Sequence, residues 1–172
     1  TEYGEAVSGT TAASIDGGWQ RTFLTFTVPS GGANIRILGG LKNAGGKAWF
    51  DSFQLEEGDV AEGYNLALNG GFEFGGSDGS LQVWTRHNME STDGRTASGK
   101  QFQSYGAKIT GAPGSRRYFR QVVNVSGPEG DVYNLSGWAK ANAVPGKEFR
   151  LGAEIRYSDG SRGWRYFEFD PY

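Results

Sequence analysis

Residues 148–157, EFRLGAEIRY, alternate between apolar and polar side chains. Every second residue in it is apolar, namely Phe149, Leu151, Ala153, Ile155 and Tyr157. The positions between them carry Arg150, Glu154 and Arg156. A period of two places alternate side chains on opposite faces of an extended strand, whereas an amphipathic helix needs a period near 3.6. The stretch therefore predicts a β-strand with one core face and one polar face.

The preceding stretch, residues 132–141 (VYNLSGWAKA), alternates in the same way. One face carries Tyr133, Leu135 and Ala139, and the other carries Asn134, Ser136, Trp138 and Lys140. The first face has the composition of a core. The second is polar but includes a Trp, which suits contact with a polar ligand.

Short runs of β-branched and aromatic residues, closed by Gly, Pro, Asn or Asp, occur on both sides of these strands. Before the acidic connection EEGDVAEGY (56–64) they are WQRTFLTFTV (19–28), NIRILGGL (34–41) and KAWFDSFQL (47–55). After it come LQVWTRHN (81–88), YGAKIT (105–110), YFRQVVNV (118–125) and GWRYFEFD (163–170). With 29 Gly, one Met and 14% aromatic residues, the chain is predicted to be an all-β sandwich of two antiparallel sheets.

The bulk composition points away from several classes of partner. The formal net charge is −2 and the Lys and Arg residues are scattered along the chain, which predicts no nucleic-acid partner. No apolar run approaches the roughly 20 residues of a membrane span, and the start TEYGEAVSGTT lacks signal-peptide features, so a secreted parent is expected to carry its signal elsewhere. The absence of Cys excludes disulfides, thiolate catalysis and Cys-ligated zinc.

Several motifs resemble the jelly-roll carbohydrate-binding module superfamily. NLALNGGFEFG (65–75), Val83-Trp84, SGKQFQSYGAKIT (98–110), YFRQVVNV and VYNLSGWAKA are similar to its opening half. WQRTFLTFTVP (19–29) and AWFDSFQLEEG (48–58) are similar to its closing half. Such modules occur in bacterial glycosidases and in wall-associated YD-repeat surface proteins. The resemblance implies a jelly-roll fold and an extracellular or cell-surface location.

The two halves stand in permuted order. The closing half covers residues 1–59, a connection covers 60–64, and the opening half covers 65–172. The chain either joins the end of one module to the start of a tandem copy, or folds as a circular permutation. We favour one composite sandwich, because neither half has enough strands for two sheets and open edges aggregate. Exchange of halves between chains is the close rival.

The resemblance also implies a structural calcium site. Its carboxylates would be Glu73 and Asp51, with further oxygens from Gly71 and from the turn that includes Ser98 and Lys100. Calcium takes six to eight oxygen ligands, so carboxylates and carbonyls suit it. The alternative is that both carboxylates cap turns in solvent.

Glycan binding needs aromatic faces for stacking and polar groups at their edges. The polar strand faces offer Trp138, Asn134, Arg150, Glu154 and Arg156, and the predicted flanking loops offer Trp84, Tyr105 and Trp164. Each aromatic residue has core packing as its alternative role. Trp19 and Trp49, in the closing motif, are expected to be structural.

No catalytic motif stands out. The only histidine, His87, has no serine and carboxylate motif beside it, and the pairs Glu56–Glu57 and Glu154–Asp159 cannot be placed across a scissile bond from sequence. The sequence thus predicts a protein that is not an enzyme: a carbohydrate-binding module of an extracellular bacterial protein. The alternative is a structural spacer or adhesion module without a glycan ligand. Two or more exposed aromatic residues on one polar face would favour the binding module.

Overall fold

The computed structural model describes residues 18–58, 63–125, 130–142 and 148–169 with their side chains, and residues 3–6 and 12–15 by their backbone alone. Residues 148–157 form strand β11 (Glu148–Tyr157), as their alternation predicts. Phe149, Leu151, Ala153 and Ile155 are all fully buried. The polar positions of β11 lie on the opposite face, so the orientation predicted for this strand is confirmed.

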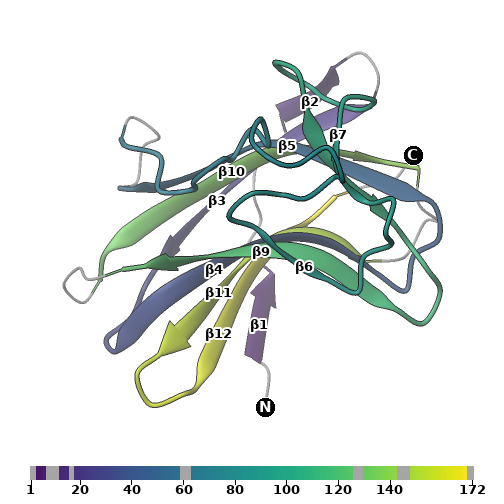
Figure 1. Cartoon of the computed structure of the whole chain (residues 1–172). Helices are drawn as coiled ribbons and strands as arrows, with labels where there is room; N and C mark the ends of the chain where they lie inside the picture. Colours follow the sequence, from purple (N-terminus) through teal and green to yellow (C-terminus); the bar gives the residue numbers. More distant parts are fainter. Residues whose placement is uncertain are drawn as a thin grey trace.

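Two six-stranded sheets pack face to face (Figure 1). Sheet A has the order β1-β12-β11-β4-β9-β6, and sheet B has the order β2-β3-β10-β5-β8-β7. All pairs are antiparallel except β1 with β12. The strands of sheet A besides β11 are β1 (Tyr3–Ala6), β4 (Gly32–Lys42), β6 (Thr85–His87), β9 (Arg116–Asn124) and β12 (Arg162–Glu168). Sheet B contains β2 (Ala12–Ile15), β3 (Trp19–Thr27), β5 (Lys47–Glu57), β7 (Gly94–Thr96), β8 (Gly106–Thr110) and β10 (Val132–Ala141).

The predicted fold class is confirmed, since the chain is an all-β sandwich. Each predicted strand appears, and the described residues add the short strands β1, β2 and β7. The run 81–88 is strand only at Thr85–His87, because Val83 has a left-handed backbone (φ 65°) and the chain turns before β6. None of the described residues forms a helix long and apolar enough to cross a membrane.

The two halves of the chain interleave in both sheets. Strand β4 lies between β11 and β9, and β10 lies between β3 and β5. In sheet A, a strand of the first half is thus flanked by two strands of the second half. In sheet B, a strand of the second half is flanked by two strands of the first half. One chain therefore builds the composite sandwich from its own two halves. The predicted limit between residues 59 and 60 lies outside the described residues.

A cluster of aromatic rings fills the space between the sheets, and Phe53 is at its centre. The Phe53 ring contacts those of Phe50, Phe72, Trp84 and Phe119, with centroids 5.6–6.0 Å apart. These rings come from both halves of the chain. Offset and edge-to-face contacts of this kind stabilise a core beyond the area that they bury.

Two glycines on the inner faces make room for this cluster. A Cβ atom at Gly39 of β4 would lie 2.9–3.1 Å from the rings of Phe119, Phe53 and Phe50. A Cβ atom at Gly137 of β10 would lie 2.6 Å from Cδ1 of Phe53. Both sheets therefore leave a gap in their side-chain layer where the Phe53 ring fits.

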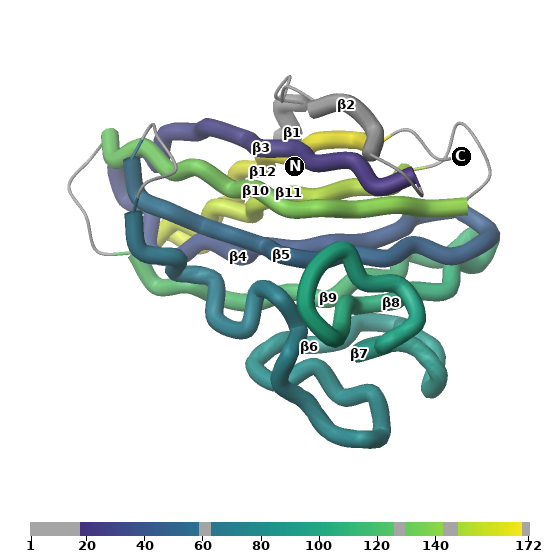
Figure 2. Tube along the Cα trace, turned by 90° about the horizontal axis from the view of Figure 1, so that it is seen from above, coloured from purple at the N-terminus to yellow at the C-terminus, as the bar shows by residue number. Residues whose placement is uncertain are grey.

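The long segment between β5 and β8 gathers at one side of the sandwich, where Figure 2 shows it in teal. Trp84, a predicted ligand residue, lies at the base of this segment and is only 5% exposed. Its indole N–H donates to the carbonyl of Asn69 over 3.1 Å, and its ring packs on Phe53. Trp84 is a core residue, so its assignment to a ligand site is corrected.

We predict that Gly137→Ala lowers the free energy of unfolding by about 1–3 kcal/mol, because the added methyl overpacks the core against Phe53. Gly71→Ala is the matched control, since the nearest side-chain atoms would lie 3.9 Å from its Cβ. Urea unfolding of both variants measures the effect. Equal stability of the two variants would contradict this account of the core.

Candidate functional site

The residues predicted to bind a ligand lie on opposite sides of the molecule. Asn134 and Trp138 are on the outer face of sheet B, on β10. The others on strands, namely Arg150, Glu154, Arg156 and Trp164, are on the outer face of sheet A, on β11 and β12. The two sets are separated by the core, so they do not form the single site that the sequence predicted.

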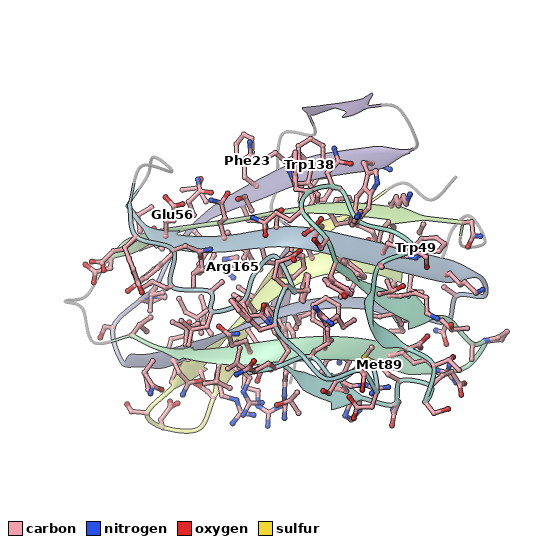
Figure 3. The ribbon with its side chains drawn as sticks, turned by 45° about the horizontal axis from the view of Figure 1, so that its top comes forward. Phe23, Trp49, Glu56, Met89, Trp138 and Arg165 are labelled. Carbon is pink, nitrogen blue, oxygen red and sulfur yellow. The ribbon has the colours of Figure 1, made fainter. Side chains whose placement is uncertain are left out.

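Phe23, which is 40% exposed, and Phe102, which is 46% exposed, give the outer face of sheet B an aromatic surface around Trp138. The Trp138 ring contacts Phe102 edge to face, with centroids 5.7 Å apart. Figure 3 shows Trp138 beside Phe23 on the outer side of this sheet. Asn134 is 7% exposed, and its amide nitrogen lies 3.3 Å from Oγ1 of Thr25.

The outer face of sheet A carries a concentration of positive charge. Four strands place their alternate residues on this face, and the cross-strand register puts those residues side by side. The cationic residues on it are Arg36, Lys42, Arg116, Arg120, Arg150, Arg156 and Arg162, and the anionic ones are Glu148, Glu154 and Glu168. In Figure 3, nitrogen-tipped side chains gather below this sheet, on the side away from Trp138. We call these residues the basic face.

Glu154 organises one end of the basic face. It is only 4% exposed, and its Oε1 lies 2.9 Å from Nε of Arg156. The same oxygen lies 3.6 Å from Nε of Arg162 and 3.8 Å from Nη1 of Arg36. A buried carboxylate needs such partners, because an unpaired buried charge is strongly destabilising. Glu154 thus holds three guanidinium groups in a fixed arrangement.

The pKa of Arg36 reflects the positive charges around it. Burial lowers the pKa of the Arg36 guanidinium, an effect that Glu154 opposes and that the positive charges of Arg120, Arg156 and Arg162 reinforce. Within the described part of the chain, Arg120 makes no ion pair of its own. Positive charge therefore exceeds negative charge along this part of the face.

Aromatic rings lie among these cations and pack against their guanidinium groups. The Arg150 guanidinium lies 4.0 Å from the ring centroid of Tyr166. The Arg116 guanidinium lies 5.0 Å from the ring of Tyr118 and 5.3 Å from that of Trp164. Two strands separate β9 from β12, so the contact with Trp164 requires the face to curve along this diagonal. Cation–π contacts of this kind keep the guanidinium groups in place.

His87 lies at the edge of the same face. Its ring stacks on Tyr118 with centroids 4.4 Å apart and an interplanar angle of 27°. Tyr118 also contacts Arg116, so an imidazole, a phenol and a guanidinium meet there. The lone histidine is exposed at the surface.

The carboxylates predicted to bind calcium hold a loop instead. Oδ2 of Asp51 accepts the backbone N–H groups of Gln101 and Phe102, at 2.8 and 2.9 Å. Oε1 of Glu73 accepts those of Ser104 and Tyr105, at 3.0 and 2.9 Å. Burial raises the pKa of Asp51, and these amide hydrogen bonds oppose that rise. The two carboxylates thus fix residues 101–105.

A positive side chain donates hydrogen bonds to the backbone carbonyls of Glu73 and of the residue before it. Arg95 donates to the carbonyls of Phe72 and Glu73, at 3.2 and 2.8 Å, and its guanidinium lies 3.2 Å from the ring centroid of Tyr105. Tyr105, a predicted ligand residue, is therefore covered by Arg95. Arg95 thus places a positive charge beside Glu73.

The remaining residues predicted for calcium add no carboxylate. Ser98 pairs through its hydroxyl with Thr96 at 2.9 Å, and Lys100 and Gly71 bring no acidic side chain. The described residues contain no group of three or more His, Cys, Asp or Glu side chains placed to hold a metal. Gly71, Ser98 and Lys100 were predicted to supply further oxygens and not carboxylates, and calcium binding stays a prediction.

We predict that Asp51→Ala speeds hydrogen exchange at the amides of Gln101 and Phe102, and that Glu73→Ala does so at Ser104 and Tyr105. Each substitution leaves amide groups without their acceptor, at a cost of about 1–3 kcal/mol. Exchange measured by NMR separates the two effects. Unchanged protection at both pairs of amides would contradict the proposed support of this loop.

The described residues define a β-sandwich protein with one basic, aromatic-bearing sheet face. No protein-family model matches the chain, and no solved structure matches it. Its curated relatives include the tRNA nuclease WapA of Bacillus subtilis (strain 168) and the tRNA(Glu)-specific nuclease WapA of Bacillus subtilis subsp. natto, each 29% identical over 154 residues. The tRNA3(Ser)-specific nuclease WapA of Bacillus spizizenii is 29% identical over 155 residues. Each match covers 84% of this chain and 6% of the relative, so the chain spans a small part of these proteins.

These relatives overturn the predicted function. The sequence predicted a protein that is not an enzyme, with a glycan partner or a spacer role and with no nucleic-acid partner. That prediction is wrong, because the relatives are named as nucleases that act on tRNA. The resemblance to the carbohydrate-binding superfamily and the extracellular or surface location stay predictions, since neither the matches nor the structure bears on them.

The basic face escaped the sequence analysis because charge was judged along the chain. Its cations lie at alternate positions of four strands from three separate parts of the sequence, so no basic run appears. The signal that was present is the alternation itself: Arg116 and Arg120 in one strand, Arg150 and Arg156 in another. Only the strand order brings these pairs together.

Proposed function

We propose that this chain is an RNA-contacting β-sandwich module of a protein that cleaves tRNA. The basic face of sheet A is the surface that contacts the RNA. One observation carries the proposal: in a chain of net charge −2, seven cationic side chains and three carboxylates share a single sheet face. Elsewhere in the chain negative charge is therefore in excess.

Such a face attracts RNA because phosphates along the backbone repeat one negative charge per nucleotide. Neutralising them with Lys and Arg releases condensed counterions, which drives binding and makes it depend on salt. The three glutamates do not cancel this charge, because they bring three negative charges to a face with seven positive ones. They hold the guanidinium groups in position, as Glu154 does for Arg36, Arg156 and Arg162.

The curated relatives support an RNA partner in a second way. Two of them are named for different tRNAs, one for tRNA(Glu) and one for tRNA3(Ser), yet each is 29% identical to this chain over almost the same length. A module shared by nucleases of different named specificity suits contact with features that all tRNAs have. The phosphate backbone is such a feature.

We predict that the purified chain binds tRNA and that its affinity falls steeply with salt. For about four phosphate contacts, the excess of cations on the face, log Kobs should fall with log [salt] at a slope of about −3. Arg120→Glu should weaken binding about tenfold or more, because it replaces an unpaired cation near the centre of the face with an anion. Fluorescence anisotropy with labelled tRNA measures both quantities.

Arg21→Glu is the matched control, since it makes the same change of charge on the outer face of sheet B. It should change affinity by about threefold or less, as a distant charge acts only through a screened field. Equal losses in the two variants, or no binding of tRNA at low salt, would refute the proposal. Denaturing gels of the same samples report whether the bound tRNA is cut, and loss of cutting in His87→Ala would assign the cleavage to this face.

A further inference from the structure

A small hollow opens on the basic face above Gly40. The residues that line it include Gly40, Lys42, Arg116, Tyr118, Glu148 and Arg150. A Cβ atom at Gly40 would lie 2.6 Å from that of Tyr118, so β4 and β9 approach too closely at this point for a side chain.

The charge of the rim restricts what can enter the hollow. The rim supplies the positive charges of Lys42, Arg116 and Arg150. Lys42 and Arg116 are cross-strand partners, and Arg150 is the partner of Gly40 itself. The non-bridging oxygens of a phosphate group carry the negative charge that these cations bind.

The cations at the rim already hold an anion of the chain itself. Glu148 bridges them: its Oε1 lies 2.9 Å from Nζ of Lys42, and its Oε2 lies 2.9 Å from Nη1 of Arg150. The two carboxylate oxygens thus occupy the positions at which two phosphate oxygens would be bound. Its side chain is 27% exposed, so Glu148 can turn out to solvent without unpacking the core.

We infer that the hollow above Gly40 is a seat for one backbone phosphate of RNA, and that Glu148 occupies its cations until the phosphate displaces it. This inference rests on the proposed function. The seat contacts the RNA backbone, because its cations pair with a phosphate group. Because the phosphate must displace Glu148, it binds more weakly than it would bind the same cations without Glu148.

The sign of the Glu148 effect tests the inference. Glu148→Gln should tighten tRNA binding by about fivefold to tenfold, because Lys42 and Arg150 then have no internal carboxylate to lose. Lys42→Gln should weaken binding and lower the salt slope by about 1. Fluorescence anisotropy with the same tRNA measures these changes.

Glu168→Gln is the control for a general loss of negative charge. Glu168 lies on the same face, but its carboxylate is 3.7 Å from Arg150 and its side chain is 46% exposed. It should tighten binding by less than about twofold. In a variant that already carries Lys42→Gln and Arg150→Gln, Glu148→Gln should tighten tRNA binding no more than Glu168→Gln does. The two cations for which Glu148 and the phosphate compete are then gone.

Two different outcomes would refute the proposed function and the phosphate seat. If the unaltered chain binds no tRNA, the proposed function fails. If it binds tRNA and Arg120→Glu weakens binding, but Glu148→Gln acts no more strongly than Glu168→Gln, the basic face stands and the phosphate seat is refuted. Thermal unfolding of each variant confirms that the fold is intact.

Discussion

The structure depends on the packing of the Phe53 ring between the two sheets. Phe53 is on β5, from the first part of the chain, while Phe72 and Phe119 come from the second part. Gly39 and Gly137 keep the side-chain layer open where these rings meet. Neither part can close this cluster alone, so burial of the rings drives the halves to interleave. The strand order with β4 between β11 and β9 follows from that requirement.

The same constraint fixes what the outer faces display. Once alternate residues of β4, β9, β11 and β12 enter the core, the residues between them must point outward. In these strands arginine is the commonest outward residue, and tyrosine and tryptophan lie among the arginines. The buried carboxylate of Glu154 and the rings beneath Arg116 and Arg150 then limit the freedom of the guanidinium groups. A preorganised cation loses less conformational entropy when it binds an anion.

The sequence predicts the strands well and the site poorly, for one physical reason. Alternation in EFRLGAEIRY and VYNLSGWAKA is a local property, so the faces of β10 and β11 could be assigned without the structure. Whether two strands share a sheet is not local. Trp138 and Arg150 were therefore placed in one site although they lie on opposite sides of the core. Trp84 is in the core because a turn before β6 directs it inward, which no periodicity reveals.

The wrong prediction of partners has the same origin. Net charge and runs of basic residues are properties of the chain, whereas attraction of a polyanion depends on the charge of one surface. In a helix, residues three or four apart share a face and a basic stripe can be read from sequence. In a sheet, the neighbours of Lys42 are Arg116 and Glu148, each more than 70 residues away. The hollow above Gly40 exists only through this register, because it needs cations from three strands around a glycine on one of them. Basic faces built on sheets are thus invisible to charge counting along the chain, and strand pairing must be known before nucleic acid can be excluded as a partner.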